Sequence, residues 1–159
     1  MNIFFLSLNP RRCAEQHCDK HVVKMIIEYA QLLSTAHHVI DGDAARSDIY
    51  RVTHKNHPSA VWVRQSAEHY GYVKDLLVEL CSEYTRRYGK VHKTERTVLP
   101  ALLLPPKNMP MNGGWSNPPQ CMPDEYKAAT TVQAYRAYYR SAKAHFAKWS
   151  APAAAPAWF

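Results

Sequence analysis

Residues 13 to 28 carry many of the side chains in this sequence that can move protons or act as nucleophiles. The helical period of 3.6 residues puts positions three and four apart on one face, and a stripe from Val22 to Leu33 forms the apolar face. Imidazole, amine and carboxylate groups serve acid–base and nucleophilic catalysis near pH 7 in suitable surroundings. The alternative is an ordinary polar helix face with hydrogen-bonded histidines. We therefore predict a catalytic face formed by His17, Lys20, His21, Lys24 and Glu28.

Amine catalysis fits this face best. Lys20 and Lys24 are one turn apart, and their repulsion as ammonium ions favours the neutral, nucleophilic form of one amine. A neutral lysine forms a Schiff base with a carbonyl carbon, including the C1′ of deoxyribose. Glu28 lies one turn beyond Lys24 and can accept a proton or pair with the ammonium group. The alternative is a plain Lys24–Glu28 surface pair, worth about 0.3–0.5 kcal/mol.

Other catalytic chemistries find less support in the sequence. Cys13, His17 and His21 have a spacing that can present three ligands to zinc, but no Cys-x-x-Cys pair or His-Glu-x-x-His motif accompanies them. We therefore expect no metal and no cofactor. The five glycines form no phosphate-binding loop, and there is no Gly-x-Ser-x-Gly elbow. These absences argue against nucleotide-dependent phosphoryl transfer and serine hydrolase chemistry.

Composition and charge point to a small soluble protein with a polyanionic partner. The 159 residues are 47% hydrophobic and 21% charged, with a formal net charge of +7. Such a charge favours nucleic acid. No apolar run approaches the ~20 residues needed to cross a bilayer, and the start of the chain lacks the basic region of a signal peptide. Four cysteines without disulfide-scaffold spacing indicate reduced thiols, so we expect a cytoplasmic protein, in the host cytoplasm if a phage encodes it. We also expect a monomer without membrane contact.

Periodicity predicts a mostly α protein, a compact helical bundle that forms one domain over residues 1–159. A short extended segment at 2–8 ends at Asn9-Pro10. Helices are predicted from about Arg12 to His38, over a short stretch capped by Ser59, from a cap at Ser66 to a stop at Gly89, and from about Thr131 to Trp149.

The proline-rich stretch at 99–126 is predicted to be irregular, and the tail at 150–159 to dock on the body. Within the proline-rich stretch, residues 105–126 are a candidate lid that pivots at Gly113-Gly114. Trp115 is placed to stack on a bound base, although packing on the body is as common for a tryptophan. Asp124 would add a carboxylate to the site.

Cations and aromatic rings combine in the 86–96 stretch and in the last predicted helix, as in proteins that bind nucleic acids. The alternative is that the tyrosines are buried while the arginines are solvated. The candidate contacts to substrate or nucleic acid are Gln16, Asp19, His54, Asn56, His57, Arg86, Arg87, Lys90, Trp115, Asp124, Arg136 and Arg140.

The segment LSLNPRRCAEQHCDKH resembles the N-terminal region of the bacteriophage pyrimidine-dimer DNA glycosylases, often called endonuclease V. That family has an alanine, an acidic residue, glutamine and histidine near its start, and Ala14-Glu15-Gln16-His17 matches this motif. Residues 56–88 are similar to the family's long middle helix by pattern. The CDKHVVKM helix also resembles uncharacterised phage proteins linked with DNA metabolism.

The resemblance implies a small, basic, mostly helical enzyme that flips a base and attacks C1′ with its N-terminal α-amine. It implies that Gln16 and His17 contact substrate. Two features depart from the family: Asn2 is a poor context for removal of the initiator methionine, and Lys24 stands where the family has its catalytic glutamate. The nucleophile is therefore the Met1 amine or Lys24, or the chemistry differs from that of the family.

Together these features predict a phage-type enzyme that acts on double-stranded DNA with a flipped base. A base-excising DNA glycosylase with amine-dependent lyase activity at abasic sites is the first hypothesis. A base-modifying transferase that uses the His/Lys/Asp helix face and a non-catalytic nucleic-acid-binding module are the alternatives.

Overall fold

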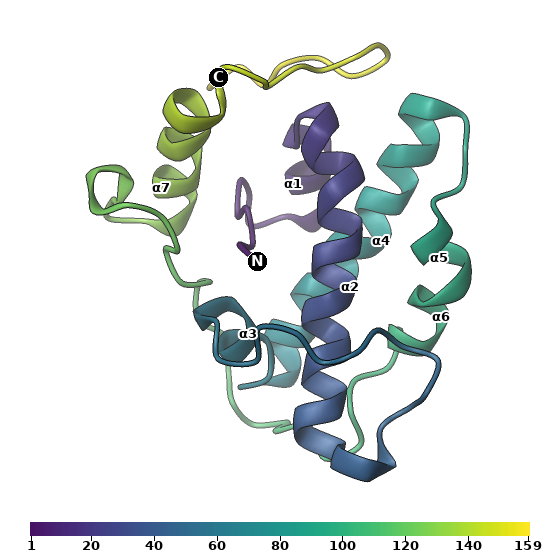
Figure 1. Cartoon of the computed structure of the whole chain (residues 1–159). Coiled ribbons are helices and arrows are strands. Elements are labelled where there is room, and N and C mark those ends of the chain that lie inside the picture. Colours follow the sequence, from purple (N-terminus) through teal and green to yellow (C-terminus); the bar gives the residue numbers. More distant parts are fainter.

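The computed structural model covers residues 1–159 and contains helices and irregular segments but no strand (Figure 1). The α-helices are α1 (Pro10–Gln16), α2 (Asp19–Asp41), α3 (Pro58–Val63), α4 (Ala67–Tyr88), α5 (Lys93–Thr97), α6 (Leu99–Leu102) and α7 (Thr131–Tyr138). Short 3₁₀ turns cover Gly42–Ala44 and Asp124–Tyr126, and a π-helical turn, Tyr139–Lys143, continues α7. The mostly α prediction is confirmed. None of the helices combines the length and apolar character that a membrane span requires.

The two long helices α2 and α4 pack against each other, and α1 packs on α4. Their contact is apolar because both helices carry buried residues at helical spacing. The buried residues include Val22, Met25, Ile26 and Leu33 of α2 and Val73, Leu76, Leu77 and Leu80 of α4.

Helix α4 has the ends that the sequence predicts. The hydroxyl of Ser66 accepts a hydrogen bond from the His69 N–H, which satisfies one of the free donors of the first turn. Gly89 ends the helix at φ 62°, a left-handed conformation that glycine adopts at little cost. Both signals are local, so the sequence alone locates this helix.

The predicted helix from Arg12 to His38 is wrong in one respect, because the chain breaks between α1 and α2. His17 and Cys18 have extended backbones there, and distant groups replace the lost helical hydrogen bonds. The Trp149 indole N–H donates to the Gln16 carbonyl, and the Asp19 N–H donates to the Lys148 carbonyl. The titratable stripe is therefore divided between two helices.

Three other expectations need correction. The last helix becomes a π-helical turn after Tyr138 and does not extend to residue 149. The short helix is capped by His57, whose Nδ1 accepts from the Ser59 N–H, because Pro58 occupies its first position. Within the proline-rich stretch at 99–126, α6 and the turn at Asp124–Tyr126 are regular.

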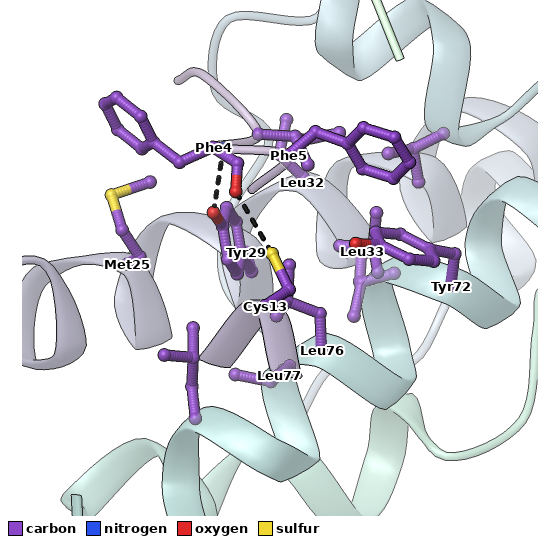
Figure 2. Close-up of a cluster of buried hydrophobic side chains, with 14 of the residues drawn as sticks. Phe4, Phe5, Cys13, Met25, Tyr29, Leu32, Leu33, Tyr72, Leu76 and Leu77 are labelled. Carbon is purple, nitrogen blue, oxygen red and sulfur yellow. Dashed lines mark hydrogen bonds between the residues drawn. The ribbon is translucent and has the colours of Figure 1, made fainter. Parts of the chain in front are cut away.

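The N-terminal segment lies buried between α2 and the α7 region (Figure 1). Ile3, Phe5 and Leu6 are fully buried. No neighbouring strand pairs with this segment, so side chains satisfy its backbone. The Phe4 N–H donates to the Tyr29 hydroxyl (3.0 Å), and the Phe4 carbonyl accepts from the Cys13 thiol (3.2 Å; Figure 2). These contacts fix the path of the first residues of the chain.

Tyr29→Phe should destabilise the protein, because the Tyr29 hydroxyl contacts both the Phe4 N–H and Nε2 of His17 (3.2 Å). Leaving two buried polar groups without a partner costs about 1–3 kcal/mol or more. Urea unfolding should show this loss. The control is Tyr84→Phe, since the Tyr84 hydroxyl makes no hydrogen bond and its ring packs on Tyr88 and His92. Equal stability of the two variants would contradict the structural role of Tyr29.

Candidate active site

A pocket of about 280 Å³ opens beside the first residue of the chain. The N-terminal segment, one face of α2 and the region after α7 form its walls. Its lining consists of Met1, Asn2, Phe4, Lys20, His21, Lys24, Met25, Glu28, Lys143 and Phe146. Four of the five predicted catalytic residues thus share this pocket, and His17 is not among them.

The carboxylate of Glu28 lies between two amines in this pocket. Its Oε2 lies 3.5 Å from the Met1 α-amine, and its Oε1 lies 3.2 Å from Lys24 Nζ. The Glu28 side chain is 16% exposed, whereas the Lys24 side chain is 62% exposed. One partly shielded carboxylate therefore holds two amines, one on the backbone and one on a long flexible side chain.

The Met1 amine is held in place by the residues that follow it. The Met1 side chain is almost fully buried, and the Asn2 amide donates to the Cys121 carbonyl (2.6 Å). The Phe4 ring packs on the His21 ring in a tilted arrangement, with the ring centres 4.3 Å apart and an interplanar angle of 30°. The proline-rich segment and α2 thus both contact the N-terminal segment. These contacts hold the Met1 amine beside Glu28.

His21 is a neutral member of this pocket. Burial lowers its pKa to about 2, with further contributions from His17 and from the nearby lysines, Lys143 first. Its Nδ1 forms a short hydrogen bond with the Tyr139 hydroxyl. At neutral pH the ring therefore acts as a hydrogen-bonding group and carries no charge.

His17 lies inside the core and not in the pocket. Its Nδ1 donates to the Cys13 carbonyl (2.7 Å), and its Nε2 accepts from the Tyr29 hydroxyl. Burial lowers the pKa of His17 to about 4. The Cys13 thiol points at the N-terminal backbone, and no cluster of His, Cys, Asp or Glu suited to a metal ion occurs in the chain. The zinc alternative therefore has no geometry to support it.

Several residues predicted to bind substrate are engaged within the protein. The Arg87 guanidinium is fully buried and pairs with Glu83 (2.6 Å) and Asp19 (2.9 Å). Asp19 also accepts from the backbone and hydroxyl of Ser150, and Arg86 pairs with Glu83. This network ties the α1–α2 junction to α4 and the C-terminal tail. The side-chain oxygen of Gln16 is buried without a partner in the same region.

The loop before α3 lies close to the pocket. Burial lowers the pKa of His57, and the positive charges of the Met1 amine and of His54 lower it further. His54 and Asn56 are exposed in this loop. They are therefore available to a ligand that approaches the N-terminus.

The remaining predicted contacts are spread over other surfaces. Trp115 is 45% exposed and packs on the rings of Phe5, Trp62, His69 and Tyr72. Arg136 donates to the Leu6 carbonyl, and Arg140 donates to the Trp158 carbonyl in the tail. Asp124 pairs with Lys127, and Lys90 is exposed just after α4. None of these residues lines the Met1 pocket.

A comparison with protein families places this geometry in context. The family model of pyrimidine dimer DNA glycosylases matches residues 1–96. The chain belongs to the pyrimidine dimer DNA glycosylase family. Membership implies DNA glycosylase activity and a DNA substrate at the level of the family. No curated protein and no solved structure matches the chain.

The family match covers only part of the pocket lining. The range 1–96 includes Met1 and the residues that α2 contributes, whereas Lys143 and Phe146 lie outside it. Sequence reasoning missed these two residues because nothing local to them marks a site. The apolar run IFFL at 3–6 is a usable signal for the amine, since burial of that run restricts the residues that precede it.

Acid should destabilise the protein through His17. The pKa of a histidine is 6.5 in the unfolded chain, whereas the pKa of His17 in the folded protein is about 4. Between pH 6.5 and pH 4 the unfolded state therefore binds a proton at His17 that the folded state does not. The contribution of His17 to the free energy of unfolding is fully present above pH 6.5. It falls as the pH drops toward 4 and is lost below that. It amounts to roughly 3 kcal/mol.

Urea unfolding at a series of pH values measures this effect. His17→Gln should be less stable at pH 7 but should lose less stability between pH 6.5 and 4. His145→Gln, at an exposed position, is the control and should keep the wild-type pH dependence. An unchanged pH dependence in His17→Gln would show that His17 is not held neutral.

Proposed function

We propose that the protein excises a base from double-stranded DNA with the Met1 α-amine as the nucleophile. The observation that carries this proposal is the 3.5 Å contact between that amine and Glu28 inside a pocket. A carboxylate in this position can take the proton that the amine loses on attack. The family supports a DNA substrate, and the net charge of +7 agrees with it.

Met1 is a better candidate nucleophile than Lys24. Effective attack requires the amine to be held close to its productive position. The Met1 amine belongs to a buried, hydrogen-bonded segment, whereas Lys24 Nζ is at the end of a largely exposed side chain. Lys24 is more suited to hold the Glu28 carboxylate from its other oxygen.

The chemistry follows the usual course of an amine-dependent glycosylase. The neutral amine nitrogen bonds to C1′ of a flipped nucleotide as the C1′–base bond breaks, and the base leaves with that electron pair and takes a proton from solvent. Glu28 accepts the proton from nitrogen and returns it to O4′ as the sugar ring opens to an imine. Loss of a C2′ proton then expels the 3′ phosphate, which cleaves the strand, and water hydrolyses the imine.

The flipped nucleotide requires contacts on the surrounding DNA. Among the predicted contacts, His54, Asn56, Lys90 and Trp115 are exposed and form no ion pair. Arg86, Asp124 and Arg140 are also exposed, but Arg86 and Asp124 are paired with Glu83 and Lys127, and Arg140 is bonded to the tail. We assign His54 and Asn56 to the DNA near the reacting sugar, since their loop adjoins the Met1 amine. Lys90 and Trp115 are assigned to more distant parts of the duplex.

Borohydride trapping on DNA with one abasic site tests the proposal. The reductant converts the imine into a stable amine, and peptide mass spectrometry locates the link, which we expect at Met1. A glycine inserted before Met1 moves the amine away from Glu28, and Glu28→Gln removes the proton acceptor. Each change should slow trapping by about a hundredfold or more.

Lys24→Gln separates the two candidate nucleophiles. This variant should still form the adduct at Met1, because its amine is not the one that reacts. A link at Lys24 would transfer the role of nucleophile to that residue. The absence of any adduct with DNA that still binds would favour the base-modifying or the non-catalytic alternative.

A further inference from the structure

Lys20 and Lys143 reach the Met1 pocket from two elements that are far apart in the sequence, α2 and the π-helical turn after α7. The ammonium group of Lys20 lies 4.7 Å from the ring centre of Phe146. That of Lys143 lies 4.4 Å from the ring centre of Tyr138 and donates to the Tyr138 hydroxyl (3.1 Å). Aromatic faces therefore orient both cations. Neither lysine forms an ion pair with a carboxylate, so both charges are free for a ligand.

The charges in the pocket are unbalanced. The Met1 amine, Lys20, Lys24 and Lys143 face a single carboxylate, that of Glu28. Both oxygens of Glu28 are already engaged by Met1 and Lys24. All three lysines line the same pocket as the imidazole of His21, whose pKa their charges help to lower. A ligand that fits this pocket should therefore bring a negative charge.

We propose that Lys20 and Lys143 together bind one backbone phosphate next to the deoxyribose that Met1 attacks. This proposal rests on the proposed function and identifies what its pocket recognises. A phosphate is the nearest anion to C1′ in DNA, and phosphate contacts fix the register of a protein on its substrate. The rings of Phe4 and Phe146 form apolar walls of the same pocket, where the sugar can lie. Lys143 lies outside the range 1–96, so the C-terminal part of this chain supplies half of the phosphate site.

Two small probes separate the phosphate site from the nucleophile. 2-Deoxyribose 5-phosphate and 2-deoxyribose carry the same aldehyde, but the 5-phosphate also prevents closure to a pyranose and leaves more of the sugar in its reactive open form. Every trapping rate is therefore divided by the rate at which the same sugar traps methionine amide, a free α-amine without a pocket. The amine and the aldehyde condense to an imine with loss of water, and borohydride reduces the imine to a secondary amine. Peptide mass spectrometry scores the adduct at Met1 alone, so that reaction at surface lysines does not count.

The wild-type protein should trap the phosphorylated sugar about tenfold faster than the plain sugar, which corresponds to one hydrogen bond to a charged group. The double variant Lys20→Gln/Lys143→Gln should lose this preference and trap the two sugars at equal relative rates. Lys107→Gln removes an equal charge near Asp41, at the far end of α2, and should keep the preference. Thermal unfolding of each variant verifies that it folds.

The outcomes distinguish the two proposals. Equal trapping of the two sugars by the wild-type protein would overturn the phosphate site and leave Met1 as the nucleophile. A preference that survives in the double variant would also overturn it. No adduct at Met1 with either sugar would contradict the proposed function, and the phosphate site would fall with it.

Discussion

The burial of the N-terminal segment is the constraint on which the rest of the site depends. Placing Ile3, Phe5 and Leu6 in the core stabilises the fold by about 1.5–3 kcal/mol for each large side chain. The segment has no strand partner, so Tyr29 and Cys13 must satisfy its backbone. A chain terminus is usually mobile. Here the apolar segment fixes it, and the α-amine is held beside Glu28 without a dedicated binding loop.

The same burial divides the titratable groups by function. His17 and His21 lose their charge because they are removed from water. The amines and Glu28 lie at the pocket wall, where they can reach a ligand. In the proposed mechanism, proton transfer is therefore assigned to Glu28. The two imidazoles have structural contacts: His17 with Tyr29, and His21 with Phe4 and Tyr139.

The features that the sequence predicts well are those with local causes. Helix α4 begins at Ser66 and ends at Gly89 because each residue satisfies the backbone of its own helix. Helical spacing likewise brings Lys20, Lys24 and Glu28 to one pocket. The break between α1 and α2 has a distant cause, the hydrogen bonds from and to residues 148–149. Lys143 and Phe146 join the pocket for the same reason, since only tertiary packing brings the end of α7 to α2.

A crystal structure of the protein reduced onto abasic DNA tests most directly whether the fixed α-amine is the nucleophile. We predict a covalent bond from the Met1 nitrogen to C1′, with the Glu28 carboxylate within hydrogen-bond distance of that nitrogen. A bond from Lys24 Nζ to C1′, or a Met1 amine far from the sugar, would contradict the central role of the buried N-terminal segment.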